Sequence, residues 1–123
     1  MAQAGTDSSV ARSLSIAAVA VGAIAGVAPK LFAGVYGLPT TGPFRFLTRL
    51  WGTRTATLGA MVLLEIDPAR VRRLAAVDAV MNAVDVAAAV SAGPDVTTRT
   101  KVMAAVTSGS FALALAAVAA ELI

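Results

Sequence analysis

Polar side chains that could pair or titrate stand inside otherwise apolar segments of this sequence. Asp78, Asn82 and Asp85 follow one another at i, i+4 and i+7, a spacing that places all three on one face of a helix. Arg54 stands in the preceding apolar segment. A lone Asp or Arg at the centre of a membrane helix costs about 2.5–3.5 kcal/mol, so such groups normally face the protein interior and find partners. The pattern therefore predicts an ion pair between Arg54 and one of the acids.

The register of an antiparallel helical hairpin predicts which of these polar residues pair. If the two segments turn at the Asp-Pro step between them, Arg54 lies level with Asp85, and Thr57 lies level with Asn82. An Arg–carboxylate pair and a neutral amide–hydroxyl bond would then form one polar ladder. Asp78 is left over, nearer the Arg-rich start of its helix, where an Arg could reach back to it or where it could face a cavity. The candidate buried polar site comprises Arg54, Thr57, Asp78, Asn82 and Asp85.

Three interpretations of this polar site remain open at the level of sequence. It can be a structural pair that sets helix register. Asp78 and Asp85 can instead be titratable groups in a water-accessible pocket that bind a proton, a cation or a cationic substrate. The same groups can also face a partner subunit.

The residue types that are absent exclude much catalytic chemistry. The chain has no His and no Cys, which excludes a His- or thiolate-ligated zinc site, a thiolate-held iron–sulfur cluster, His-ligated haem, and Ser-His or Cys-His catalysis. Ser108 and Ser110 lack a base and read as a packing notch within a helix. No catalytic residue, metal site or cofactor is predicted, and the protein is expected not to be an enzyme.

The composition indicates a membrane protein. Of 123 residues, 58% are hydrophobic and only 14% are charged, and the mean hydropathy is +0.80. Soluble domains average roughly 45–50% apolar and about 25% charged residues. The ten basic residues are scattered along the chain, so they form no basic face and predict no nucleic-acid binding. The lipid bilayer is the expected surrounding.

Four apolar blocks follow a short polar start. Each is close to the ~20 residues that a helix needs to cross a bilayer, and none shows the alternation of barrel strands. The sequence therefore predicts an all-α fold, an integral membrane bundle of four transmembrane helices, with residues 1–13 as a polar N-terminal tail and 14–123 as a single domain. The blocks are Leu14–Phe32, Phe44–Ile66, Val71–Ala92 and Val102–Ile123.

Helix ends are marked by turn and capping residues. Asp67 followed by Pro68 predicts the start of the third helix, Gly93 before Pro94 predicts the end of it, and a threonine between residues 97 and 100 can cap the fourth. The first block also has the layout of a secretory signal peptide, with Arg12 before an apolar run. Its length favours a retained helix.

Small residues recur at four-residue spacing and predict close helix packing. In lipid, helices associate largely through such faces. The spacings cannot tell whether the partner helix belongs to the same chain or to another. The residues concerned are Gly22 and Gly26, then Ala79, Ala83 and Ala87, then Ala105 and Gly109, and finally Ala112, Ala116 and Ala120.

Aromatic and basic residues near the block ends predict contacts with the membrane interface. These are Tyr36, Arg45, Arg49, Trp51, Arg70, Arg72 and Arg73. With Arg49 and Arg54 left out as intramembrane, the other eight basic residues divide equally between the two sides of a four-helix arrangement. The cluster from 70 to 73 is the local reason to place both termini in the cytoplasm.

One resemblance covers most of the chain. Gly37-Leu38-Pro39, the run from Arg49 to Arg54 and the two acids Asp78 and Asp85 resemble a family of small bacterial four-helix membrane proteins, catalogued as a domain of unknown function. The resemblance implies a bacterial plasma membrane and no activity.

The expected function is that of a small non-enzymatic integral membrane protein, a structural or accessory subunit that interacts with a second copy or with another membrane protein. The alternative is a small oligomeric transporter, coupled to protons or cations, that uses Asp78 and Asp85.

Overall fold

The computed structural model describes residues 2–121, and side-chain surroundings from residue 9 onward. Over this range the chain forms five helices and no strand, so the all-α prediction is confirmed. The end of the fourth predicted block, residues 122 and 123, lies outside the described residues. The helices are α1 (Ala2–Val27), α2 (Pro29–Tyr36), α3 (Gly42–Leu64), α4 (Pro68–Val90) and α5 (Thr98–Ala119).

The prediction of four transmembrane helices is wrong. Among the described residues, two helical segments are long and apolar enough to cross a membrane, Ser9–Val27 of α1 and Thr98–Ala119 of α5. The other two long helices are interrupted by charge. Arg49 and Arg54 stand inside α3, and α4 carries three arginines in its first turns and two acids further on. The prediction assumed that buried partners would offset the cost of placing these groups in hydrocarbon, but Arg49 is exposed and the Arg54–Asp85 pair is only partly buried.

A proline accounts for the fifth helix. Pro29 occupies the first turn of α2 and follows Ala28, whose backbone (φ −124°, ψ 63°) is not helical. Proline clashes with a continuing helix on its N-terminal side but fits a first turn well. The first predicted block therefore divides into α1 and the short α2. At the other end, α1 begins at Ala2, so the segment predicted as a polar tail forms the first turns of the helix.

Helix pair α1–α3 is held by direct contact between backbones. A Cβ built on Gly52 would lie 2.5 Å from the carbonyl oxygen of Gly22 and 2.7 Å from the backbone nitrogen of Gly26. Further along the pair, a Cβ on Gly59 would lie 2.8 Å from the carbonyl oxygen of Ser15. No larger residue fits at these contacts, so glycine sets the separation of the two helices.

Helix pair α4–α5 packs through a mixed polar and apolar face. The buried residues of α4 are Ala75, Asp78, Ala79 and Asn82, spaced at i, i+3, i+4 and i+7 as one helix face requires. They oppose α5, whose buried positions include Ser108, Leu115 and Val118. Of the alanines spaced every fourth residue in α4, Ala83 and Ala87 are exposed. Ala79 stays in the contact, but Asp78 and Asn82 occupy the rest of the inner face, and Ala83 and Ala87 point away from it.

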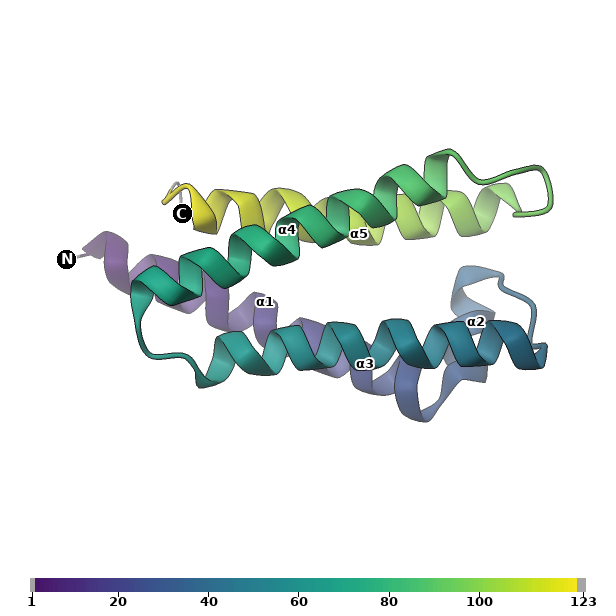
Figure 1. Cartoon of the computed structure of the whole chain (residues 1–123), viewed down its shortest axis with the longest axis horizontal. Helices are drawn as coiled ribbons and strands as arrows, with labels where there is room; N and C mark the ends of the chain where they lie inside the picture. The colour runs from purple at the N-terminus through teal and green to yellow at the C-terminus, as the bar shows by residue number, and fades with distance from the viewer. Residues whose placement is uncertain (1, 122–123) are drawn as a thin grey trace.

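The two pairs meet at one end of the molecule and separate toward the other. Figure 1 shows α1 beside α3 and α4 beside α5, with both chain termini at the end where the pairs converge. A small apolar cluster joins them there, including Ala11 from α1, Val62 from α3, Ala75 from α4 and Leu115 from α5. Toward the opposite end the short α2 contacts both α3 and α5.

The helix ends confirm two of the three predicted caps. Asp67 Oδ1 accepts a hydrogen bond from the backbone nitrogen of Ala69 at 3.0 Å. Thr97 Oγ1 accepts from the backbone nitrogen of Thr100 at 3.2 Å. The prediction for Gly93 is wrong, because α4 ends at Ser91 in a right-handed conformation. The left-handed glycine is Gly37 (φ 69°), which ends α2.

We expect Gly22→Ala to destabilise the protein and Gly26→Ala to stabilise it slightly. A Cβ at Gly22 would lie 2.5 Å from the Gly52 carbonyl oxygen, whereas one at Gly26 meets nothing within 4 Å. Overpacking costs about 1–3 kcal/mol, and a Gly→Ala change in open helix gains up to about 1 kcal/mol. Thermal unfolding of both variants in the same detergent, followed by circular dichroism, measures the difference. Equal midpoints would contradict the backbone contact.

Candidate functional site

The carboxylate of Asp85 on α4 receives hydrogen bonds from two side chains of α3. Arg54 binds it in a fork, with Nη1 donating to Oδ1 at 3.3 Å and Nη2 donating to Oδ2. Trp51 Nε1 also donates to Oδ2, at 3.3 Å. The predicted pairing of Arg54 with Asp85 is therefore present in the structure, and Trp51 is an additional donor that the hairpin register did not indicate.

The pair is not buried, which corrects the predicted buried site. The side chains of Arg54 and Asp85 are 32% and 22% exposed. Helices α3 and α4 share few contacts because each packs along a different partner. The two side chains therefore reach across a divergence between the pairs and remain partly open to the surroundings. One atom is an exception, because Arg54 Nε is fully buried and has no hydrogen-bond partner in the described structure.

Asp78 and Asn82 form a separate pair inside α4. Asn82 Nδ2 donates to the Asp78 side-chain Oδ1 and to the Asp78 backbone oxygen, each at 2.9 Å. Asp78 is 8% and Asn82 9% exposed. The predicted bond between Asn82 and Thr57 is wrong, since Thr57 is exposed. Asn82 satisfies its amide one turn back along its own helix, which requires no second helix.

Burial raises the pKa of the Asp78 carboxyl above its ordinary value, because the charged form loses hydration. The positive charge of Arg54 and the hydrogen bond from Asn82 act in the opposite direction, and the negative charge of Asp85 adds to the increase. Burial is the largest of these effects. Asp78 is thus harder to ionise than a carboxyl group in water.

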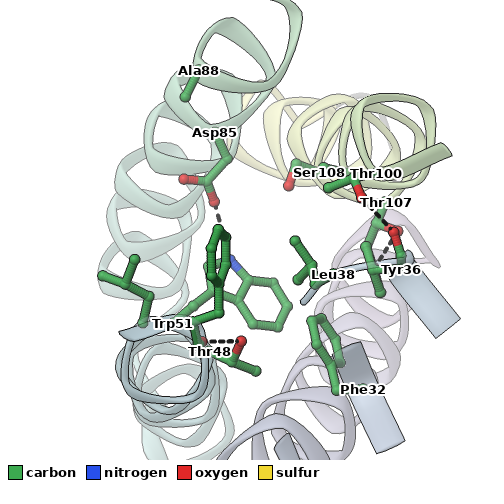
Figure 2. A pocket seen from close by; sticks show the side chains of 13 residues that line it. Phe32, Tyr36, Leu38, Thr48, Trp51, Asp85, Ala88, Thr100, Thr107 and Ser108 are labelled. Atoms are coloured by element: carbon green, nitrogen blue, oxygen red, sulfur yellow. Dashed lines mark hydrogen bonds between the residues drawn. The ribbon is translucent and has the colours of Figure 1, made fainter. Parts of the chain in front are cut away.

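Beside Asp85 a cavity of about 270 Å³ opens between the two helix pairs. Three aromatic residues cluster at its wall. The rings of Phe32 and Tyr36 stack at 4.3 Å between centroids, and Phe32 lies 5.1 Å from the Trp51 ring in a tilted arrangement. Figure 2 shows Asp85 above Trp51, with Phe32 and Tyr36 on the side toward α2. The wall is completed by Leu38, Phe44, Leu47, Thr48, Ala88, Thr100, Ala104, Thr107 and Ser108.

Short helix α2 is fastened to α5 at the mouth of this cavity. The Tyr36 hydroxyl shares a hydrogen bond of 2.6 Å with Thr107 Oγ1, and Thr100 Oγ1 donates to the Tyr36 backbone oxygen at 2.7 Å. Arg99 Nη2 donates to the carbonyl oxygen of Val35 at 3.1 Å. A guanidinium at the C-terminal end of a helix is favourable because the last carbonyls lack partners within the helix. These bonds hold the two rings of α2 in place.

The residues predicted at a membrane interface divide into two groups. Tyr36 and Trp51 contact other helices at the cavity wall. The arginines are exposed or, in the case of Arg72, partly exposed. Arg45, Arg49 and Arg73 are exposed, Arg70 Nε lies 3.6 Å from Asp67 Oδ2, and Arg72 Nε lies 3.1 Å from Glu121 Oε1.

Phe32, Thr100 and Thr107 belong to the site but were not singled out from sequence. Phe32 and Tyr36 stand at i and i+4, which on a helix makes their rings neighbours. This spacing could have predicted their contact. Trp51 and Arg54 stand at i and i+3 on one face of α3, which is why both reach Asp85. Thr100 and Thr107 had no signal in the sequence.

Comparison with known proteins gave no match to any family model, and no curated protein or solved structure is significantly similar to the chain. Within the described residues, no group of three or more acidic, His or Cys side chains is placed to hold a metal ion. At Asp85 the structure holds a partly exposed carboxylate, bonded to Arg54 and Trp51, beside an aromatic wall.

We expect the Arg54–Asp85 pair to contribute about 1 kcal/mol, the upper end for partly exposed ion pairs, rather than the larger cost of breaking a buried one. A double-mutant cycle with Arg54→Gln and Asp85→Asn, read by thermal unfolding in detergent, measures this coupling. Arg49→Gln, an exposed arginine on the same helix, is the control. A coupling of zero would show that the two side chains do not interact.

Asp78→Asn is expected to raise stability at neutral pH. The folded-state pKa of Asp78 is raised, so its contribution to stability is fully present below the unfolded pKa of about 3.9 and is lost as pH rises through the folded value. Asn removes this loss because it does not ionise. The stability difference between variant and wild type is thus expected to shrink toward acid pH. Asp95→Asn, at an exposed position, controls for charge; a pH-independent difference would contradict this account.

Proposed function

We propose that the chain is a small non-enzymatic integral membrane protein, held in the bilayer by α1 and α5, which acts as a structural or accessory subunit. The observation that carries the proposal is the small buried fraction of these two helices. Only 28% of the Ser9–Val27 segment and 17% of the Thr98–Ala119 segment is buried. An apolar helix in the core of a soluble protein is mostly buried, whereas these two present their apolar side chains outward, where lipid is the matching surrounding.

Helix α4 supports the same proposal through its two faces. Val77, Val80 and Val84 are 53%, 63% and 61% exposed, while Asp78 and Asn82 lie inside. In water the reverse orientation is favourable, because apolar surface is removed from solvent at roughly 25 cal/mol per Å². Polar side chains inside and valines outside are expected where an apolar partner covers that face of α4, as in a subunit that binds another protein.

A structural or accessory role fits the polar groups better than catalysis does. Asp85 is bonded to Arg54 and Trp51, and Asp78 accepts from Asn82, so each acid already has a partner that fixes the geometry. Ser108 lies at the cavity wall, but the chain has no His or Cys to act with it. Asp85 joins α3 to α4, and Asp78 is bonded within α4.

We further propose a multi-pass arrangement in a bacterial plasma membrane with both termini in the cytoplasm. The termini lie at the same end of the molecule (Figure 1), so α1 and α5 would cross in opposite directions. The turn between α3 and α4 lies at that end as well, together with the first turns of α4, which carry Arg70, Arg72 and Arg73. Basic residues favour the cytoplasmic side.

A proton- or cation-coupled transporter that uses Asp78 and Asp85 is the second candidate. The observation that favours it is the position of Asp85 at the wall of a cavity. Proteoliposomes loaded with a pH-sensitive dye distinguish it from the first candidate. Proton uptake that is lost in Asp85→Asn would support transport, and uptake no faster than in empty vesicles would support the structural role.

Membrane retention tests the first proposal. We expect the full chain to stay in the membrane pellet after washing with alkaline carbonate and to enter the supernatant only with detergent. Peripheral proteins held by charge are released by that wash, whereas helices in the hydrocarbon core are not. Release of the chain by carbonate alone would contradict the proposal.

Orientation is tested separately, with reporters fused to the C-terminus. A reporter active only in the cytoplasm is expected to work, and one active only in the periplasm is expected to fail. Comparable activity of both reporters would contradict a single orientation, because it indicates insertion in two directions.

A further inference from the structure

We propose that the cavity between the two helix pairs binds a small aromatic or branched alkyl ammonium ion, that is, an organic cation with a hydrophobic body. This goes beyond the proposed function and does not rest on it, since the cavity is formed by the fold whether or not α1 and α5 cross a membrane. Its volume of about 270 Å³ is slightly below the usual range for ligand pockets, roughly 300–1,000 Å³. A small ligand is therefore required.

The charge of the wall selects a cation. Asp85 is the one charged residue among those that line the cavity. Arg54, which compensates Asp85, is not part of the lining. A ligand in the cavity thus approaches the carboxylate directly and the guanidinium only across it. An anion would meet that carboxylate on a wall that carries no positive side chain, which is unfavourable where the dielectric constant is low.

The aromatic residues supply the second half of the recognition. Phe32 and Tyr36 stand on α2 and Trp51 stands on α3, and all three line the cavity (Figure 2). The Phe32 ring is the neighbour of both other rings. A ring face attracts a cation within about 6 Å of its centroid, and Trp is the strongest of the three. A quaternary ammonium needs no hydrogen-bond acceptor, so it can use the Asp85 charge although Arg54 and Trp51 already occupy hydrogen-bonding positions on that carboxylate.

The three aromatic rings are preorganised by contacts within the protein. Tyr36 is bonded to Thr107 through its hydroxyl, Phe32 stacks on Tyr36, and Trp51 is bonded to Asp85. Fixed rings reduce the side-chain entropy that binding would otherwise cost. A neutral molecule of the same shape would fill the same space but would gain nothing from Asp85 or from the charge on the ring faces.

Trp51 makes this inference measurable, because it is the single tryptophan of the chain. The full-length protein in a non-ionic detergent is titrated with benzyltrimethylammonium and, in parallel, with neopentylbenzene, in which carbon replaces the charged nitrogen. We expect a saturable shift of Trp51 emission with the cation, at an affinity roughly tenfold above that of the neutral compound. Equal affinities, or no saturable shift up to the solubility limit of the cation, would overturn the proposal.

Two variants and a control place the site. Asp85→Asn keeps the size of the side chain and one acceptor oxygen but loses the charge, so it is expected to weaken the cation roughly tenfold and the neutral compound much less. Phe32→Leu is expected to weaken the cation although the carboxylate stays, and it keeps the test valid if the first variant does not fold. Asp67→Asn removes an acid far along the chain, at a position where Asn also caps, and is expected to bind like wild type. Unchanged cation affinity in both Asp85→Asn and Phe32→Leu would overturn the proposal.

Discussion

The Asp85 carboxylate is the polar group that connects the two helix pairs where they separate. Its partners, Arg54 and Trp51, both stand on α3, while Asp85 itself stands on α4. At the other end of the molecule the pairs are joined by an apolar cluster. Between these points the helices diverge, and the cavity lies in that divergence. The shape of the cavity therefore depends on the hydrogen bonds to Asp85 together with those that hold α2 to α5.

Glycine places α3 so that these bonds can form. Because Gly52 lies against the backbone of α1 at Gly22, the opposite side of α3 is free to face α4. Trp51, one residue before Gly52, and Arg54, two residues after it, both lie on the side of α3 that faces α4. The close contact and the polar bridge thus come from neighbouring residues of one helix, and a shift of the first would move the second. In the other pair, Asp78 and Asn82 satisfy each other within α4, which lets that helix pack on α5 without an unpaired polar group.

The part of the fold that sequence could predict was local. Asp67 marks a helix start because its side chain bonds to a nearby backbone nitrogen, and neither partner depends on distant structure. The pairing of Arg54 with Asp85 follows from the tight turn between their helices. The bond from Thr57 to Asn82 does not form because the same register argument assumes parallel axes, and these helices diverge. Long side chains can bridge such a divergence, whereas Thr cannot.

Two larger features were beyond a single sequence. The count of transmembrane helices failed because it assumed buried partners for the charges that interrupt α3 and α4, whereas Arg49 is exposed and the Arg54–Asp85 pair is only partly buried. The aromatic cavity depends on the fold of residues 28–41, where Pro29 begins a separate helix and Gly37 ends it. That turn brings Phe32 and Tyr36 beside Trp51, and no periodic pattern in the chain encodes the angle at which it does so.

The central claim is that Asp85 holds the two helix pairs at a defined separation, and a distance measurement between α3 and α4 tests it most directly. The chain has no cysteine, so Leu50→Cys and Val84→Cys, both exposed positions, provide unique sites for spin labels. In the otherwise unchanged chain, pulsed electron paramagnetic resonance is predicted to give one narrow distance distribution. Adding Asp85→Ala is predicted to broaden it toward longer distances, while Asp95→Ala leaves it unaltered. An identical distribution with and without Asp85 would contradict the account.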